Sequence, residues 1–126
     1  FEFLACGDIF AFASKFETFG LSVAEAAISG VPVVANDLSV LHEVLKTDDG
    51  RPAALFAAGG NAAAFAEKIA ALFADVDLAE NLSAAGRDLA EKYAPQAMCL
   101  EYEKLLATGE PKPSPTRRRP LPSTAN

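Results

Sequence analysis

Two glutamates, Glu17 and Glu25, stand eight positions apart on either side of a lone glycine, Gly20. Gly20 directly precedes an alanine-rich segment of helical character. The first turn of a helix offers unpaired N–H groups and a positive dipole end to an anion. A glycine at that point lets the backbone approach a ligand closely or adopt a positive φ. The stretch predicts a site for an anionic, phosphorylated ligand, although it has no dinucleotide-binding fingerprint and no P-loop spacing.

The surrounding sequence predicts a βαβ unit that would position this site. Residues 9–13 (IFAFA) and 31–35 (VPVVA) are short apolar runs, typical of strands buried on both faces of a parallel sheet. Between them lie a loop, residues 14–20, and a helix over about residues 21–29, joined by a right-handed crossover. Ligands of open α/β sheets bind outside the carboxyl ends of the strands, which is where this loop falls.

The rest of the chain predicts one weaker strand and several helices. Residues 39–45 are expected to form a short helix with Ser39 as its cap, and residues 53–57 (AALFA) a third strand. Apolar side chains at helical spacing then predict three helices that open near Asn61, Leu78 and Pro95. The predicted fold class is α/β, with parallel strands, flanking helices and a helical C-terminal end.

Composition limits the class of protein. The chain has 126 residues, of which 51% are hydrophobic, so it can bury a core and is not disordered throughout. It begins inside what looks like a structured segment, so we expect a fragment. No apolar run is long enough to span a bilayer, and no signal peptide is visible. The two cysteines, Cys6 and Cys99, suit neither a disulfide framework nor a metal site, which favours a reducing cytoplasm.

Charge separates a folded body from a tail. The net charge is −6, and nearly all acidic residues lie in residues 1–107, which argues against a nucleic-acid partner. Residues 108–126 are rich in proline and poor in large apolar side chains, so we expect a disordered tail. Its three arginines, residues 117–119, are more typical of a solvated tail than of a membrane contact. A peripheral contact with an acidic lipid surface stays as the alternative.

Several motifs occur in an order and spacing that are typical of one family. They are Ser14, Glu17-Thr18-Phe19-Gly20-Leu21, Glu25-Ala26, Gly30-Val31-Pro32-Val33-Val34, Asn36-Asp37 and Glu43-Val44. Together they resemble the C-terminal domain of family 4 (group 1) retaining glycosyltransferases of the GT-B fold. The resemblance covers nearly everything before the tail. It implies that residues 1–107 are the C-terminal part of a Rossmann-like domain that binds a nucleotide sugar.

The resemblance also implies roles for single residues. Glu25 matches a glutamate that accepts hydrogen bonds from ribose hydroxyls, which suits a carboxylate with two acceptor oxygens. Glu17 matches a catalytic glutamate that faces the donor sugar and the leaving phosphate. Phe19, Gly20 and Leu21 match a loop and helix start whose backbone amides meet sugar hydroxyls and the diphosphate. Ser14 is included among the donor-binding candidates.

The implied reaction is glycosyl transfer from a nucleotide diphosphate sugar to an acceptor hydroxyl, with retention of the anomeric configuration. The acceptor, a sugar, a lipid-linked sugar or a small molecule, is left open. No cofactor and no metal are implied, because the helix terminus and basic side chains take over the charge of the departing diphosphate. Without an acceptor domain and upstream basic residues, this chain alone is not expected to catalyse transfer.

Each candidate also has a structural interpretation. Glu25 follows Ser22 by three positions, the spacing of a capping box at a helix start. Glu17 would by itself be an ordinary surface-loop carboxylate, and Ser14 a turn residue. The resemblance makes ligand contact the preferred prediction for Glu17 and Glu25. It also leaves two other functions open: a GT-B epimerase or phosphorylase-like enzyme, and a noncatalytic module that binds sugar nucleotides.

Other features suit chemistry less well. The sequence DVD at residues 75–77 imitates a metal-binding DxD motif but lies between two predicted helices, far from the strand ends. Residues 48–49, both Asp, are typical of a turn. His42 is the only histidine, has no obvious nucleophile beside it, and is expected to be a structural or surface residue. It stands where the family often has proline, and Ser39 and Val40 stand where glycines are common, which puts donor contacts from that segment in doubt.

Overall fold

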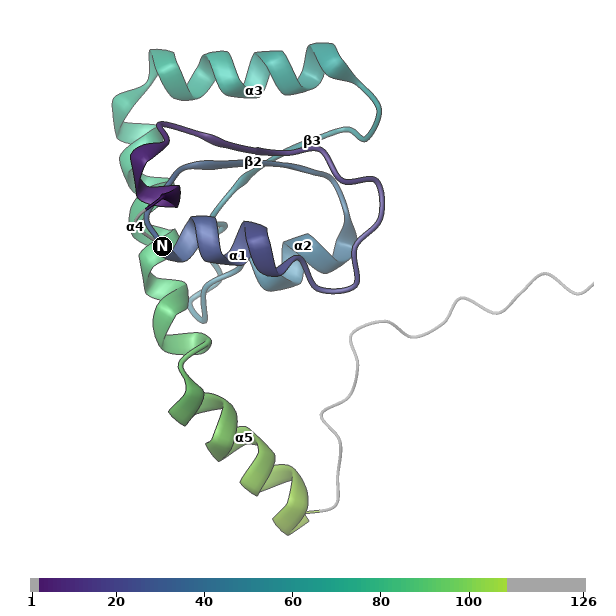
Figure 1. The fold of residues 1–126 in the computed structure, drawn as a ribbon, viewed down its shortest axis with the longest axis vertical. Coiled ribbons are helices and arrows are strands. Elements are labelled where there is room, and N and C mark those ends of the chain that lie inside the picture. The colour runs from purple at the N-terminus through teal and green to yellow at the C-terminus, as the bar shows by residue number, and fades with distance from the viewer. Residues whose placement is uncertain (1–2, 109–126) are drawn as a thin grey trace, which may run out of the picture. The chain divides into compact units, whose positions relative to one another are not determined.

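The computed structural model describes residues 3–108. They fall into two compact units, one that ends at Ala94 and one that begins at Pro95. The elements, shown in Figure 1, are η1 (Leu4–Cys6), β1 (Phe10–Phe12), α1 (Leu21–Ile28), β2 (Val33–Asn36), α2 (Ser39–Val44), β3 (Leu55–Ala57), α3 (Ala62–Ala74), α4 (Val76–Lys92) and α5 (Pro95–Thr108).

The three strands form one parallel sheet in the order β1-β2-β3. Phe10 is opposite Val33 across the first pair, and Val34 is opposite Leu55 across the second. Every residue of the central strand β2 is buried, as its continuous apolar run predicts. The prediction of an α/β fold with parallel strands and flanking helices is confirmed.

The two faces of the sheet carry separate apolar clusters because side chains alternate along each strand. Val33 and Ala35 of β2 pack with α1, α2 and the second half of α4. Val34 packs on the other face with α3 and the first half of α4. Figure 1 shows α3 on one side of the sheet and α1 and α2 on the other. Helix α4 therefore contributes side chains to the apolar clusters on both faces of the sheet.

Helices α1 and α4 cross in close contact at Gly86. A Cβ placed on Gly86 would lie 2.3 Å from the carbonyl oxygen of Ala27, far inside van der Waals contact. Gly86 and Ala27 are both buried. The absence of a side chain at residue 86 therefore sets the distance between the two helices.

Three sequence predictions differ from the structure in detail. Strand β1 is only half-buried and Ala11 is exposed, because α3 packs over β2 and β3 and leaves this face of β1 uncovered. Ser39 is not a cap: Leu38 is the N-cap of α2, and Ser39 is the first helical residue. Helix α4 begins at Val76 rather than near Leu78.

Asp75 explains the early start of α4 and the DVD sequence. Its side-chain Oδ1 accepts a hydrogen bond of 2.9 Å from the backbone N–H of Leu78, the geometry of an N-cap. The carboxylate thus satisfies a helix terminus instead of a metal ion. Among residues 3–108, no group of three or more His, Cys, Asp or Glu side chains could hold a metal.

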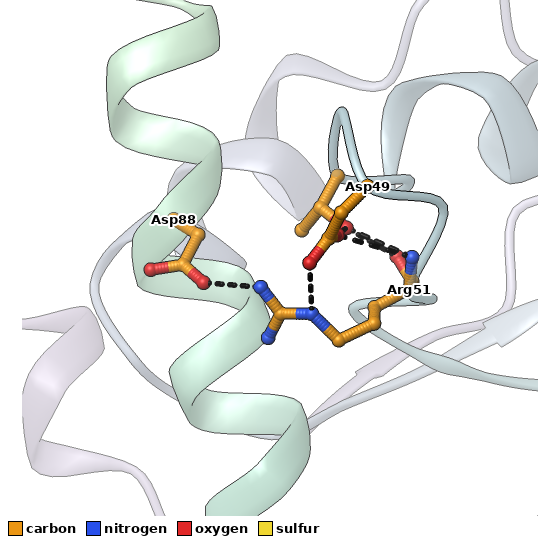
Figure 2. A network of polar contacts seen from close by, with 4 residues as sticks. Asp49, Arg51 and Asp88 are labelled. Atoms are coloured by element: carbon orange, nitrogen blue, oxygen red, sulfur yellow. Dashed lines mark hydrogen bonds and ion pairs between the residues drawn. The ribbon is translucent and has the colours of Figure 1, made fainter.

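A network of polar contacts joins the turn before β3 to α4 (Figure 2). The Arg51 guanidinium donates to Asp49 and to Asp88 of α4, with both N···O distances 2.7 Å. The Thr47 hydroxyl also donates to Asp49. The hydrogen bonds from Thr47 and Arg51 lower the pKa of Asp49 to about 2. Residues 48–49 therefore belong to a turn, as predicted.

The predicted tail, residues 108–126, falls outside the described residues except for Thr108, which ends α5. The boundary after residue 107 stays a prediction. Within the described part of the chain, every helix is too short or too polar to cross a bilayer.

We expect Gly86→Ala to lower the free energy of unfolding by about 2 kcal/mol. Overpacking typically costs about 1–3 kcal/mol, and here the new methyl group meets backbone that cannot rotate away, which outweighs alanine's better helix propensity. Urea unfolding measures the change. Gly59→Ala is the matched control, because a Cβ there meets nothing within 4 Å. Equal stability of the Gly86 variant and the wild type would contradict the proposed close contact.

We expect Thr47→Val and Arg51→Ala each to raise the pKa of Asp49 from about 2 toward its ordinary 3.8, because each removes a hydrogen bond that lowers it, the one from Thr47 being the largest single cause. A lowered pKa in the folded state stabilises the fold above pH 3.8 and loses that effect as the pH falls to about 2. Carboxyl carbon NMR titration measures both pKa values. An unchanged pKa in both variants would show that the network does not form in solution.

Candidate functional site

The loop of residues 14–20 follows β1 at the carboxyl end of the sheet and leads directly into α1. Its last residue, Gly20, is the N-cap of α1 and has a left-handed backbone, with φ 86° and ψ 52°. A Cβ on Gly20 would lie 2.8 Å from Cδ2 of Leu41 and 3.0 Å from Cγ1 of Val23. Both the dihedral angles and the packing therefore require glycine here.

The start of α1 differs from the starts of α3 and α4. Asn61 caps α3 by accepting a hydrogen bond of 3.1 Å from the N–H of Ala64, and Asp75 caps α4 in the same way. Gly20 has no side chain that could cap α1. Within residues 3–108, no acceptor pairs with the backbone N–H groups of residues 21–23, and the first bond of the helix joins Ala24 N–H to the Gly20 carbonyl. Leu21 and Ser22 are exposed, so their N–H groups are open to an anion, whereas Val23 is fully buried.

In the sequence, Glu17 precedes this open helix end and Glu25 follows it inside α1. Glu17 is half-buried in the loop, and Glu25 is exposed on α1. The capping box of Ser22 and Glu25 does not form, because Ser22 is the second residue inside the helix rather than its N-cap. In the part of the chain that the structure describes, neither carboxylate has a hydrogen bond or an ion pair. Both are therefore available as acceptors.

Ser14 joins the loop to the end of β2. Its hydroxyl donates to the carbonyl oxygen of Phe16 at 2.9 Å, which makes it a turn residue. Its own carbonyl oxygen accepts a hydrogen bond of 2.6 Å from Nδ2 of Asn36. Asn36 is 2% exposed, and its Oδ1 is buried without a hydrogen-bond partner among the described residues. The sequence analysis includes Asn36 among the family motifs but gives it no role; its signal is a polar residue that ends an apolar strand.

Phe19 packs against the end of α4. Its ring meets the ring of Tyr93 edge to face, with centroids 5.8 Å apart. The Tyr93 hydroxyl donates to the carbonyl oxygen of Val44 at 2.8 Å. Burial, followed by the charges of Glu43 and Asp48, raises the pKa of Tyr93 to about 12. A residue distant in the sequence thus holds the side chain of Phe19.

His42 has two contacts near the strand ends. Its Nε2 and Oδ1 of Asp37 lie 2.6 Å apart, and its ring stacks on that of Phe56 with centroids 3.7 Å apart. Asp37 follows β2 directly, and Phe56 belongs to β3. The pair connects α2 to the sheet, and the half-exposed imidazole is structural, as the sequence predicts.

The predicted residues, from Ser14 to Glu25, form the loop that follows β1 at the carboxyl end of the sheet and the first turns of α1. This segment carries backbone amides and two free carboxylates. Such an arrangement can bind a group that carries negative charge beside hydroxyls, because N–H groups donate to the former and carboxylates accept from the latter. Which ligand contacts these residues make stays a prediction.

Comparison with known proteins connects this arrangement to one family. The family model described as "Glycosyl transferases group 1" matches residues 2–89. A phosphatidyl-myo-inositol mannosyltransferase of Mycobacterium leprae (strain TN) is 39% identical over 77 residues, 61% of this chain and 20% of the relative. The sulfoquinovosyl transferase SQD2 of Arabidopsis thaliana is 36% identical over 90 residues, 71% of this chain and 18% of the relative.

One solved structure is similar to this chain in both fold and sequence. The sucrose-phosphate synthase of Thermosynechococcus elongatus superposes with a TM-score of 0.64 at 27% identity, over 83% of this chain and 27% of that chain. The chain thus spans about a fifth of the length of the curated relatives and about a quarter of the solved structure. Its sheet and flanking helices correspond to part of a GT-B domain. The chain belongs to the group 1 family of glycosyl transferases.

Proposed function

We propose that this chain forms the donor-binding part of a retaining, family 4-type transferase that uses a nucleotide diphosphate sugar. The whole protein would pass the glycosyl group to an acceptor hydroxyl with the anomeric configuration retained. One observation carries the proposal: the uncapped start of α1 follows β1 at the carboxyl end of a parallel sheet, with one unpaired glutamate before it in the sequence and one after it. Membership in the group 1 family supports the reaction class.

The proposed donor complex uses the backbone of the helix start for the diphosphate. The free N–H groups of Leu21 and Ser22 and the positive end of the α1 dipole would bind its oxygens. As the bond from the anomeric carbon to the diphosphate breaks, negative charge grows on the leaving oxygens. Donors that are already oriented stabilise this charge without having to reorganise.

The carboxylates are proposed to bind the two ends of the donor. Glu25, on the exposed surface of α1, would accept hydrogen bonds from the ribose hydroxyls. Glu17 would face the donor sugar and the leaving phosphate, and is the proposed catalytic residue. The backbone of Phe19, Gly20 and Leu21 would complete the contacts to sugar hydroxyls and diphosphate, and Ser14 would lie at the edge of the same site.

Activity is proposed for a longer protein rather than for this segment alone. The chain spans 18% to 27% of the relatives described above, and its net charge of −6 offers little to a diphosphate beyond the helix start. An acceptor site and further basic residues would come from other parts of the protein. The use of cysteine favours the cytoplasm as its compartment, with peripheral membrane contact as the alternative.

We expect Glu25→Gln to raise KM for the nucleotide sugar about 10- to 100-fold, because a hydrogen bond to a charged group contributes about 1.5–3 kcal/mol. We expect Glu17→Gln to lower kcat by about 100-fold, the scale on which one oriented electrostatic group affects a transition state. The complete protein is incubated with a panel of UDP-, GDP- and ADP-linked sugars, and release of the nucleoside diphosphate is followed.

Glu80→Gln is the matched control, because Glu80 is also exposed but lies on α4, outside the candidate site. It should leave kcat and KM unchanged. If no member of the panel is consumed, the proposed transferase function is wrong. If a donor is bound without turnover in the wild type, the noncatalytic module becomes the better description. An effect of Glu25→Gln on stability alone would remove the proposed ribose contact.

A further inference from the structure

The open helix start needs support from outside its own segment. A side-chain cap fixes the first turns of α3 and α4, whereas α1 has none. Two packing contacts replace it. Leu41 of α2 is fully buried and fills the space beside Gly20, and the ring of Tyr93 packs against Phe19. Leu41 supports the glycine, and Tyr93 supports the residue before it.

Tyr93 is itself held firmly. It is the C-cap of α4, and its backbone N–H donates to the carbonyls of Glu91 and Leu89. Its hydroxyl donates to the carbonyl oxygen of Val44 in the last turn of α2. Beside it, Nζ of Lys92 donates to the carbonyl oxygens of Glu43 at 3.2 Å and Lys46 at 2.8 Å. The end of α4 is therefore fixed to the C-terminal end of α2.

Phe19 depends on this contact more than a core residue would. Phe19 is 39% exposed, so burial in the core does not hold it. Among the residues that the structure describes, its ring partner is Tyr93, at a centroid distance within the range of favourable edge-to-face pairs. The next residue, Gly20, has the most conformational freedom of any residue type, so the loop would be poorly fixed if the ring were released.

We propose that Tyr93 is a positioning residue for the donor site: by holding the Phe19 ring, it holds the backbone of residues 19–21 in the orientation that receives the diphosphate. The inference rests on the proposed function, because the loop is a donor loop only if the chain binds nucleotide sugars. Tyr93 itself makes no contact with the donor. Tyr93 acts by ordering the loop before the ligand binds.

The test compares two substitutions of Tyr93 in the complete protein. Tyr93→Leu removes the aromatic ring, and Tyr93→Phe keeps the ring but removes the hydrogen bond to Val44. We expect Tyr93→Leu to raise KM for the consumed nucleotide sugar about three- to tenfold while kcat changes less than about twofold, since an aromatic pair has about this strength and acts on binding. Tyr93→Phe should keep KM near the wild-type value.

A double-mutant cycle separates the ring contact from general loss of stability. Phe19→Leu should raise KM as much as Tyr93→Leu, and the double variant should raise it no further, because both changes remove the same contact. Ile69→Val is the matched stability control, since it removes one methyl group from the apolar cluster on the other face of the sheet. An unchanged KM in Tyr93→Leu, or an equal rise in Ile69→Val, would overturn the inference.

Hydrogen exchange distinguishes failure of this inference from failure of the proposed function. Amides of residues 19–24 should exchange faster in Tyr93→Leu than in the wild type and Tyr93→Phe, with no ligand present. If the wild type consumes no nucleotide sugar, the proposed function is wrong, and exchange alone decides whether Tyr93 orders the loop. If exchange is the same in all three proteins, Tyr93 is not a positioning residue.

Discussion

The left-handed backbone of Gly20 is the constraint on which the candidate site depends. Its dihedral angles end the loop and start α1 at a residue that has no side chain to cap the helix. The same residue leaves room for Leu41, so α2 can pack under the beginning of α1. One glycine therefore exposes the amides of the first turn and also brings a second helix close enough to support them.

The core explains why this support is rigid. The central strand β2 is buried along its whole length, and separate apolar clusters cover the two faces of the sheet. Helix α4 belongs to both clusters and approaches α1 to backbone contact at Gly86. A small change in the position of α4 would therefore move α1 as well, because closely packed backbones do not absorb displacements. The site is held by the same helix that closes the core.

Much of the fold could be predicted from the sequence, because apolar runs and helical spacing are local signals. The buried strand β2, the loop and α1 follow from residues that are adjacent in the chain. The details that were wrong depend on where other elements pack: Ala11 is exposed because of the lateral position of α3, which no pattern in β1 encodes. The sequence at residues 75–77 fits either a metal motif or a helix cap, and the start of α4 decides between them.

The residues of the candidate site could be predicted from the sequence, whereas the contacts that hold them in place could not. Glu17, Gly20 and Glu25 were recognised by spacing, whereas the contact of Asn36 with Ser14 joins residues 22 positions apart. The bond from Tyr93 to Val44 spans 49 positions and has no local signature. The family model ends at residue 89, so Tyr93 lies beyond the residues that the model matches. A segment cut at that boundary would keep every residue proposed to touch the donor, yet it would lose the part of the chain that keeps them in order.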